Sequence, residues 1–574
     1  MTAISMGVPR ISVADVTQNA REICAMIEMA KADAYKLLVM PELCLTGSTC
    51  GDLFRQEALI AAVDKELASV VQATADSDVC VVLGAPRRTD GALYNCAVVI
   101  HGGCERACIP KRVSQAQARW FVAGAGYGTV VVPYKDGAKR ICIGFNADEV
   151  VAAADADAFV CIDASPTIVG GGASRRERVR KASLRTNAPV AYVNAGFGES
   201  TTDNVYGGEG FLYRGGACFA ETEAMAFSRQ FVGCTAEDAV MEADSSINNA
   251  PYDSFLPMDA RREGALREVL QIQTLGLAKR FLHTRADSLV LGVSGGLDST
   301  LAMVVCVLMM RMLKRPASDI VAVTMPGYGT SGRTYKNARA LMRLLAVDAR
   351  EISIKPACEQ HFDDIGHDRC PDLTFENAQA RERTQILLDI AGMENGLVVG
   401  TGDLTELALG FATYNGDHMS SYGVNAGVPK TVVRATVRYA AESGMFVDEV
   451  NRILIDIAET PISPELLPPL ETGDISQKTE EIVGPYEIND FFLYHVLCDG
   501  AAPSVILDKA MQTFGTEYDC EFLRGQWNAF CRRFFAQQFK RSCMPDGPQV
   551  FGGGLSPRGG YVMPSDAVGA AWQL

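Results

Sequence analysis

The first 235 residues alternate short apolar runs with amphipathic stretches. Apolar runs cover residues 36–40, 79–85, 95–102 and 190–196. Between them, residues 20–32 repeat apolar side chains at the spacing of one helix face. Short apolar runs bounded by turn residues are typical of buried strands. The pattern therefore predicts a layered α/β domain in the first half of the chain.

A more regular alternation of strands and helices follows in the second half. The pattern predicts strands at 288–293, 320–325, 350–354 and 397–402, and helices at 299–314, 331–346 and 376–394. Strands that alternate with helices form βαβ units, whose strands are parallel and whose ligands bind at the carboxyl ends of the strands. The second half is therefore expected to be a doubly wound parallel sheet.

Residues 236–264 separate these two patterns. This segment is polar and acidic, contains proline and shows no sustained periodicity. A chain of 574 residues is also too long for a single hydrophobic core. We therefore predict two domains, at residues 1–250 and 262–574.

The charge balance limits the kinds of partner. Asp and Glu number 69 against 53 Lys and Arg, which gives a formal net charge of -16. Such a chain lacks the broad basic surface that nucleic acid or an anionic membrane requires. The longest apolar stretch, 301–310, is about half as long as a membrane-spanning helix, and the N-terminus lacks the pattern of a signal peptide. We expect neither a membrane nor a nucleic-acid partner.

The chain has 18 cysteines. Many lie in apolar strand-like runs, as Cys142 and Cys161 do, which is typical of reduced cysteine used as a small hydrophobic residue. This usage predicts a cytoplasmic location. His101, Cys104 and Cys108 come nearest to a metal cluster, but no second pair with zinc spacing follows, so we predict no zinc site.

A glycine-rich string, SGGLDST at 294–300, lies between a predicted strand and a predicted helix. Its two glycines allow backbone N–H groups to converge, and the helix N-terminus adds a positive dipole end, so the string predicts an anion cradle. It lacks the Gly-Lys-Ser/Thr of a Walker loop. The alternative is a tight glycine turn that closes a βα unit without binding anything.

The string resembles the pyrophosphate loop of the ATP pyrophosphatase superfamily, whose members adenylate an oxygen atom of their substrate. Seven further strings narrow the resemblance to NAD synthetase of the long, glutamine-dependent type. They are TMPGYGTSGRT (324–334), ENAQARERT (376–384), GTGDLTELALGFATYNGDHMS (400–420), NAGVPKT (425–431), TPISPELLPP (460–469), QKTEEIVGPYEINDF (477–491) and QFKRSCMPDGP (538–548). The resemblance implies a carbon–nitrogen ligase that amidates nicotinic acid adenine dinucleotide to NAD, with ATP converted to AMP and pyrophosphate.

The same resemblance assigns site residues. ATP is expected at Gly292, Val293, Ser294, Gly295, Gly296, Leu297, Asp298, Ser299, Thr401 and Lys430. The substrate dinucleotide is expected at Asn377, Arg381, Glu406, Phe411, Tyr414, Asp417 and Lys540. Asp298 and Glu406 are the expected Mg²⁺ ligands, because both follow predicted strand ends that meet if strands 288–293 and 397–402 are neighbours.

Three points stay open in this half. Glu406 is either a metal ligand or only the start of an amphipathic helix. Arg333 and Lys336 are either anion contacts or a solvated helix start. The proline-rich segment 461–469 resembles a loop of the family that closes over ATP and excludes water from the adenylate.

The first half resembles the nitrilase-fold glutaminase that is joined to this synthetase, and thus implies an α/β sandwich. In that family a glutamate acts as general base, a lysine stabilises the oxyanion and a cysteine attacks the amide carbon of glutamine. The string MPELCLTGSTCGDLF (40–54) supplies the glutamate as Glu42, and CIPK (108–111) supplies the lysine as Lys111. The string NAGFGESTTDNVYGGEG (194–210) matches a further segment of the family.

The cysteine is where the resemblance fails. The family pattern is a strand that runs into Ile-Cys-Glu-Asp-x-Trp, whereas this chain reads RICIGFNADEV (140–150). Alignment through Arg140 and Asp148 puts Asn146 in the place of the nucleophile, and alignment through Gly144 puts Ala147 or Asp148 there. Cys142 is either a core residue or a displaced nucleophile. In addition, Gln117 stands where the family has a glutamate, and the stretch after Lys111 is shortened.

These observations predict an NAD synthetase that uses ammonia directly. The alternatives are an enzyme that uses glutamine through an unrecognised cysteine, a relative of GMP or asparagine synthetase, and a scaffolding homologue without activity. The resemblance implies a homo-oligomer, and it leaves open whether a separate glutaminase docks.

Overall fold

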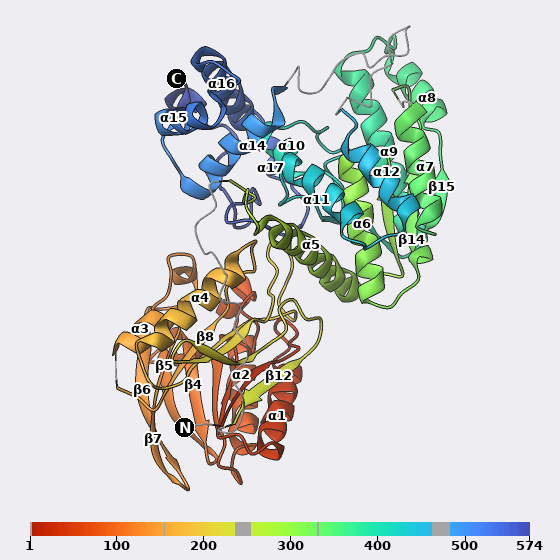
Figure 1. Cartoon of the computed structure of the whole chain (residues 1–574). Coiled ribbons are helices and arrows are strands. Elements are labelled where there is room, and N and C mark those ends of the chain that lie inside the picture. Colours follow the sequence, from red (N-terminus) through yellow and green to blue (C-terminus); the bar gives the residue numbers. More distant parts are fainter. Residues whose placement is uncertain (1–2, 154, 236–253, 330–331, 462–482) are drawn as a thin grey trace. The chain divides into compact units, whose positions relative to one another are not determined.

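The computed structural model describes residues 3–153, 155–235, 254–329, 332–461 and 483–574. Two compact units make up the chain (Figure 1). Unit 1 comprises Met1–Ser200 and Val205–Ala250, and unit 2 comprises Thr201–Asn204 and Pro251–Leu574. Most of the predicted boundary 236–264 lies outside the described residues. None of the described helices combines the length and the apolar composition that crossing a bilayer requires.

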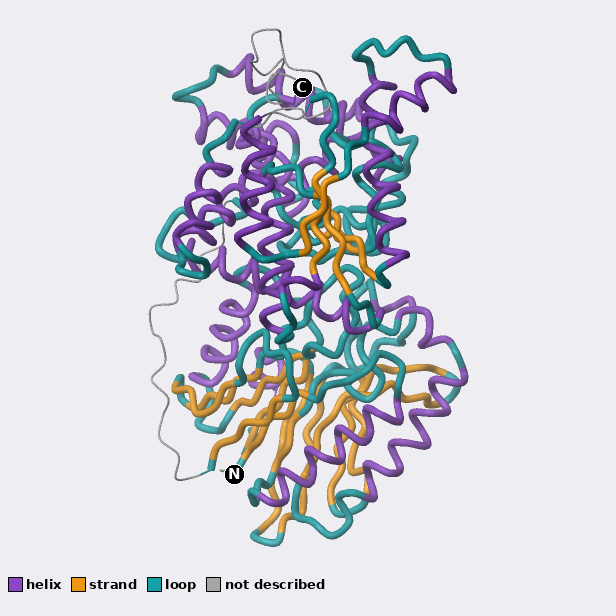
Figure 2. Tube along the Cα trace, turned by 90° about the vertical axis from the view of Figure 1, so that its right-hand side faces the viewer, coloured by secondary structure: helices purple, strands orange, loops and turns teal. Residues whose placement is uncertain are grey.

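Unit 1 is a sandwich of two six-stranded sheets. One sheet has the order β12-β1-β2-β3-β4-β5 and the other the order β11-β10-β9-β8-β7-β6, drawn in orange in Figure 2. Its strands are β1 (Ile4–Val8), β2 (Leu37–Val39), β3 (Cys80–Thr89), β4 (Ala92–His101), β5 (Cys104–Pro110), β6 (Tyr127–Tyr134), β7 (Gly137–Gly144), β8 (Ala158–Asp163), β9 (Val190–Asn194), β10 (Gly210–Arg214), β11 (Ala217–Glu221) and β12 (Gln230–Cys234). Its helices are α1 (Val16–Ala32), α2 (Glu57–Gln72), α3 (Ala147–Ala153) and α4 (Gly171–Leu184).

Alternation along each strand divides the apolar side chains of unit 1 between two layers. In β2, Leu37 and Val39 join a core that also contains Ile141 and Ile143 of the opposite sheet. Leu38 faces the other way, into a cluster with α1 and α2. Side chains of successive strand residues point to opposite faces, so each sheet buries one face against its partner and the other under helices. The result is a four-layer α/β sandwich, as the sequence predicts.

Unit 2 contains one parallel sheet of five strands. Its order is β15-β14-β13-β16-β17, and every pair is parallel. The strands are β13 (Ser288–Gly292), β14 (Ile320–Thr324), β15 (Asp348–Glu351), β16 (Gly396–Gly400) and β17 (Tyr422–Gly423). Described helices are α5 (Arg262–Thr284), α6 (Leu297–Met312), α7 (Gly332–Leu344), α8 (Lys355–Ile365), α9 (Leu373–Met393), α10 (Leu404–Leu409), α11 (Lys430–Glu442), α12 (Asp448–Ala458), α14 (Tyr486–Tyr494), α15 (Pro503–Phe514), α16 (Cys520–Ala536) and α17 (Gln538–Arg541).

The chain reverses its direction across this sheet between β13 and β16. From β13 it runs outward to β14 and β15, and it then returns to place β16 on the other side of β13. In α/β sheets the carboxyl ends of the strands at such a reversal form the ligand crevice. The predicted pairing of the strands that precede Asp298 and Glu406 is thereby confirmed.

Two predicted elements of unit 2 are displaced in the structure. Helix α6 begins at Leu297 rather than Ser299, because Gly296 is its N-cap and the end of the phosphate loop is already its first turn. Strand β15 covers Asp348–Glu351 rather than 350–354. The apolar residues that suggested the later range belong to the turn into α8, where Ile354 is buried as the N-cap. The loop predicted at 461–469 lies outside the described residues except for its first residue.

A close backbone approach in unit 1 generates a prediction. Gly84 of β3 lies under the turn that carries Glu42, and a Cβ there would lie 2.0 Å from Leu43 N. We expect Gly84→Ala to displace this turn and to lower the free energy of unfolding by about 1–3 kcal/mol, the usual cost of overpacking. Gly172→Ala is the control, since its Cβ would meet its nearest atom at 3.5 Å. Equal chemical denaturation midpoints for the two variants would contradict the prediction.

Candidate active site

A loop between β13 and α6 forms one wall of a cavity of about 350 Å³ in unit 2. Gly295 has a φ of +88°, and a Cβ there would lie 2.1 Å from Thr334 O, so the loop requires glycine at this position. Ser294 Oγ accepts a hydrogen bond from Gly296 N at 3.1 Å. The loop is therefore held by contacts between its own residues. The N-terminus of α6 lines the cavity as well, and a helix N-terminus suits an anion.

All ten residues predicted to bind ATP line this cavity. They are Gly292, Val293, Ser294, Gly295, Gly296, Leu297, Asp298, Ser299, Thr401 and Lys430. Of the residues predicted for the dinucleotide, Glu406, Phe411 and Asp417 also line it. The apolar part of the lining includes Val323, Met325 and Leu387, and the last two lie beside Gly292. The lining of the cavity thus combines apolar side chains with polar and charged ones.

Of the other residues predicted for the dinucleotide, Tyr414 lies in the turn 410–418, and Asn377, Arg381 and Lys540 contact this turn. Asn377 Oδ1 accepts a hydrogen bond from Thr413 Oγ1 at 2.9 Å. Arg381 donates to Tyr414 O at 3.3 Å. Lys540 Nζ donates to the carbonyls of Gly410 and Ala412, both at 2.7 Å. Their contacts in this structure shape a turn that borders the cavity.

Three carboxylates converge on Lys430, whose side chain lines the cavity. Its Nζ lies 2.7 Å from Asp298 Oδ2, 2.7 Å from Asp403 Oδ2 and 2.8 Å from Glu406 Oε1. Asp298 starts α6 after β13, whereas Asp403 and Glu406 follow β16, so the neighbouring strands bring them together. The convergence of Asp298 and Glu406 was predicted, but the participation of Asp403 was not. Asp403 and Glu406 form a capping box on α10, and the Asp-x-x-Glu spacing is the signal that marks it.

A buried amide ties the two strand ends together. Asn425 Nδ2 donates to Asp298 O and to Thr401 O, both at 2.9 Å. Gln273 of α5 in turn donates to Asn425 Oδ1 at 2.9 Å. Asn425 lies in the NAGVPKT string, yet no local spacing reveals which backbone atoms it bridges. It fixes the separation of the two loops that carry the carboxylates.

The electrostatics of this cluster favour a further cation. Burial raises the pKa of Glu406 to about 7 and that of Asp403 well above its usual range, against the opposing charge of Lys430. Burial works to lower the pKa of Lys430, but the three carboxylates outweigh it and raise that pKa. Among the described residues, buried Asp298 Oδ1 has no hydrogen-bond partner. Carboxylate oxygens from these three residues lie within 4.8 Å of one another, and such donors suit a hard divalent cation.

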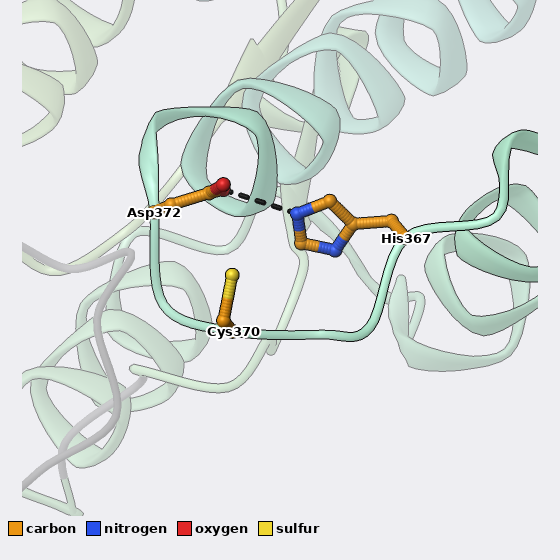
Figure 3. A group of neighbouring side chains, drawn as sticks. All are labelled: His367, Cys370 and Asp372. Carbon is orange, nitrogen blue, oxygen red and sulfur yellow. Dashed lines mark hydrogen bonds and ion pairs between the residues drawn. The ribbon is translucent and has the colours of Figure 1, made fainter.

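A second group with metal-ligand side chains lies between α8 and α9. His367, Cys370 and Asp372 are drawn in Figure 3. The His367 ring accepts Arg369 N–H at Nδ1 and contacts Asp372 Oδ1 through Nε2 at 3.1 Å, so neither ring nitrogen offers a lone pair. A hydrogen bond to Asp368 raises the pKa of Cys370 to about 11, which keeps the thiol protonated. These contacts favour a loop that is stabilised internally, with Asp372 capping α9.

Arg333 has an ion-pair partner on a neighbouring helix. Its guanidinium lies 2.6 Å from Asp456 Oδ1 of α12. This contact joins the start of α7 to the end of α12, next to the cavity residue Ile457. It gives Arg333 a structural role that the sequence did not indicate.

In unit 1, the predicted base and lysine meet at the carboxyl ends of strands. Glu42 is fully buried, and Lys111 Nζ lies 2.7 Å and 2.6 Å from its two carboxylate oxygens. Asn95 and Gln117 also donate to Glu42 Oε1, at 2.6 Å and 3.2 Å. One carboxylate is thus neutralised by one ammonium and saturated with neutral donors.

The thiol of Cys142 points away from the side of the sheet on which Lys111 lies. Ile141 and Ile143 face the core between the sheets, whereas Cys142 faces α3 and donates to Val150 O at 3.4 Å. Lys111 Nζ lies 5.4 Å from the ring centre of Phe145, which follows the inward positions of β7. Burial also raises the pKa of the Cys142 thiol. Position and protonation both disfavour Cys142 as a nucleophile.

Asn146 is the residue at the turn from β7 into α3. Its side chain is exposed, and its Oδ1 accepts hydrogen bonds from the N–H groups of Asp148 at 2.9 Å and Glu149 at 3.3 Å. It therefore caps α3. That Asn146 takes the place of the nucleophile stays a prediction.

Comparison with known proteins covers both units. Residues 269–462 match the NAD synthase family, and residues 3–113 match the carbon-nitrogen hydrolase family. The glutamine-dependent NAD(+) synthetases of Mycobacterium tuberculosis (strain ATCC 25618 / H37Rv) and Mycobacterium leprae (strain TN) are each 33% identical to the chain. Each alignment covers 98% of this chain and 95% of the relative. These matches favour an NAD synthetase over a relative of GMP or asparagine synthetase.

Solved structures share the fold. The glutamine-dependent NAD(+) synthetase from Cytophaga hutchinsonii superposes with a TM-score of 0.81 at 19% identity, covering 99% of this chain and 98% of that one. The enzyme from Acinetobacter baumannii in complex with ADP gives a TM-score of 0.68 at 19% identity, covering 99% of both chains. Both structures thus share the fold of this chain over almost its whole length.

The position of Cys142 generates a prediction about thiol reactivity. We expect iodoacetamide to leave Cys142 unmodified in the native protein, because its thiol is buried and protonated. Exposed Cys104 and Cys520 are the internal controls and should be alkylated. Mass spectrometry of the digested protein measures all three sites. Alkylation of Cys142 at the rate of Cys104 would contradict its assignment to the core.

Proposed function

The chain belongs to the glutamine-dependent NAD(+) synthetase family, and we propose that within this family it takes its nitrogen from ammonia. It is a carbon–nitrogen ligase that uses ATP to amidate nicotinic acid adenine dinucleotide to NAD. The proposal on nitrogen rests on one observation above the others. At the end of β7, where the family pattern has a cysteine, Asn146 uses its side chain to cap α3.

For the synthetase reaction, we propose that the cavity of unit 2 holds ATP and the nicotinate carboxylate together. The apolar side chains of Met325 and Leu387 suit contact with the adenine ring, and the backbone N–H groups of the loop at Gly295 suit the phosphates. A nicotinate carboxylate oxygen then attacks the α phosphorus, and the bond to pyrophosphate breaks. Ammonia attacks the resulting acyl carbon, the bond to AMP breaks, and the nitrogen gives up a proton. Lys430 supports the departing pyrophosphate with its positive charge.

Asp298 and Glu406 are the proposed Mg²⁺ ligands, with Asp403 beside them. Their three carboxylates face a single ammonium, so that a second cation can share their oxygens. The free Asp298 Oδ1 supports this assignment. When bound, the metal would balance the negative charge of the phosphates while the nicotinate carboxylate attacks the α phosphorus.

The choice of ammonia follows from what Glu42 and Lys111 can do alone. Together they can assist a nucleophile, but release of ammonia from glutamine begins with attack on the amide carbon, which needs a thiolate. Cys142 and Cys161 both lie in the cluster under α3 and α4, away from the core between the sheets. Gln117 contributes an amide where the family has a carboxylate. These contacts support a glutaminase site without its nucleophile.

The alternative is that this enzyme uses glutamine, and one contact in unit 1 supports it. Glu42 and Lys111 are still in contact, as a glutaminase requires. An unrecognised cysteine would then have to reach them. The partners proposed from the family, a second copy of this chain or a separate glutaminase, and a cytoplasmic location stay predictions.

Removal of the Asp298 charge tests the synthetase site. We expect Asp298→Asn to lower the rate of AMP and pyrophosphate release on the order of a hundredfold, because it keeps the shape but removes a metal ligand. Asp319→Asn is the control, since Asp319 pairs with Arg315 on the surface of the same unit. Near-normal turnover of Asp298→Asn at saturating Mg²⁺ would remove Asp298 from the site.

A comparison of ammonium and glutamine as nitrogen donors tests the proposal that the enzyme uses ammonia. Ammonium should support NAD formation by the parent enzyme, whereas glutamine at equal concentration should give little NAD and little glutamate. Cys142→Ser should leave both results unchanged. Asn146→Cys should raise glutamate release by about tenfold or more, because a thiol at a helix N-terminus is readily ionised. Efficient use of glutamine by the parent, lost in Cys142→Ser, would show that Cys142 is the nucleophile.

A further inference from the structure

The three carboxylates that pair with the Lys430 ammonium differ in their exposure. The ammonium has three N–H donors and meets one oxygen from each of Asp298, Asp403 and Glu406. Asp298 and Glu406 line the cavity and are about a fifth exposed, at 23% and 21% of their side chains. The side chain of Asp403 is 0% exposed and does not line the cavity. Ligands can therefore reach two of these counter-ions, while the third is sealed in the protein.

Asp403 is also the most firmly held of the three. Its Oδ1 accepts Glu406 N–H at 2.8 Å, and its own N–H donates to Glu406 Oε2 at 3.3 Å. These two hydrogen bonds form the capping box of α10 and fix the carboxylate plane. Its second oxygen, Oδ2, lies 2.7 Å from Lys430 Nζ as an ion pair and makes no hydrogen bond to any described residue. One side chain thus divides its oxygens between a helix cap and the lysine.

The first turn of α10 holds Lys430 at both ends. Thr405 Oγ1 accepts the backbone N–H of Lys430 at 3.0 Å, and Thr405 is itself bonded to buried Asp490. The ammonium at the other end of the side chain lies 5.6 Å from the ring centre of Tyr486. Because the Lys430 side chain is a flexible four-carbon chain, its backbone contacts alone do not place its charge. A fixed anion at the ammonium does.

We propose that Asp403 is a positioning residue for the reaction, the permanent counter-ion that holds the Lys430 ammonium at the phosphate end of the cavity. The inference rests on the proposed function, in which Asp298 and Glu406 serve as metal ligands. Once those two carboxylates engage a cation, Asp403 is the one of the three carboxylates that still pairs with Lys430. The two N–H groups that Asp298 and Glu406 release are then available to phosphate oxygens. Without Asp403, the ammonium would rest on Asp298 and Glu406 and compete with the metal.

Asp403→Asn separates the cap from the charge. Asparagine caps helices as well as aspartate does and has the same shape, so the variant should keep the helix cap and lose less stability than Asp403→Ala. We expect kcat to fall about tenfold or more while the KM for ATP changes less than about threefold. Asp519→Asn is the matched control, because Asp519 caps α16 through Phe522 N and has no lysine beside it among the described ion pairs. It should leave kcat, KM and melting unchanged.

A binding measurement without turnover gives a second readout. We expect Mn²⁺, titrated into the ATP-free protein and followed by electron paramagnetic resonance, to bind Asp403→Asn about tenfold more weakly than the parent, since the lysine now competes for its ligands. Asp403→Ala removes cap and charge together and should lose stability as well. In a Lys430→Met background, Asp403→Asn should cause no further fall in kcat, because the pair acts as one unit.

Three results would overturn the inference. They are parental kcat and Mn²⁺ affinity in Asp403→Asn, equal losses of stability in Asp403→Asn and Asp403→Ala, and independent losses of kcat for Asp403→Asn and Lys430→Met. The Mn²⁺ titration does not depend on NAD formation. An inactive parent enzyme would therefore overturn the proposed function, whereas unchanged Mn²⁺ binding in Asp403→Asn would overturn the role of Asp403.

Discussion

The buried ion cluster of Lys430 with Asp298, Asp403 and Glu406 is the constraint on which the site of unit 2 depends. Buried charges are costly unless they are paired, and here one lysine neutralises only one of three carboxylates. The three carboxylates stay close together because rigid backbone holds each of them in place, and burial raises the pKa of Asp403 and Glu406. The adjacency of β13 and β16 sets the distance between the two loops, and buried Asn425 fixes it further. A parallel sheet with its reversal at any other strand pair would separate these charges.

Unit 1 contains the same kind of contact with a different balance. Glu42 and Lys111 form a one-to-one pair, and Asn95 and Gln117 fill the remaining acceptor sites of the carboxylate. A pair of this kind has neither excess charge nor unpartnered carboxylate oxygens, so it attracts no cation. The two clusters show why residue type alone does not define a site. The ratio of charges, and the groups that saturate them, decide whether a carboxylate and a lysine bind a ligand or only each other.

The sequence predicted those features that depend on local pattern. Alternation and periodicity placed β13, β14, β16 and α9 to within a few residues, and the strand ends then implied that Asp298 and Glu406 meet. Asp403 was not predicted from the sequence, because its ion pair with Lys430 forms only when α11 packs next to α10. No short sequence motif indicates that packing. Asn377, Arg381 and Lys540 were assigned by resemblance, and the structure shows contacts that only tertiary packing creates, around the turn 410–418. By contrast, the alternation in RICIGF correctly predicted that the Cys142 side chain lies in the core, because strand periodicity is a local property.

The end of β7 illustrates how a site can change while its fold persists. The core between the sheets is built from side chains such as Ile141 and Ile143, and none of it depends on the residue that follows the strand. At that position an asparagine supplies an acceptor for two N–H groups of α3, a contact typically worth about 1 kcal/mol over a residue that cannot cap. Catalytic residues are often poor choices for local stability. If Asn146 replaces the nucleophile, as proposed, loss of glutaminase chemistry and a better-capped helix are two consequences of the same side chain.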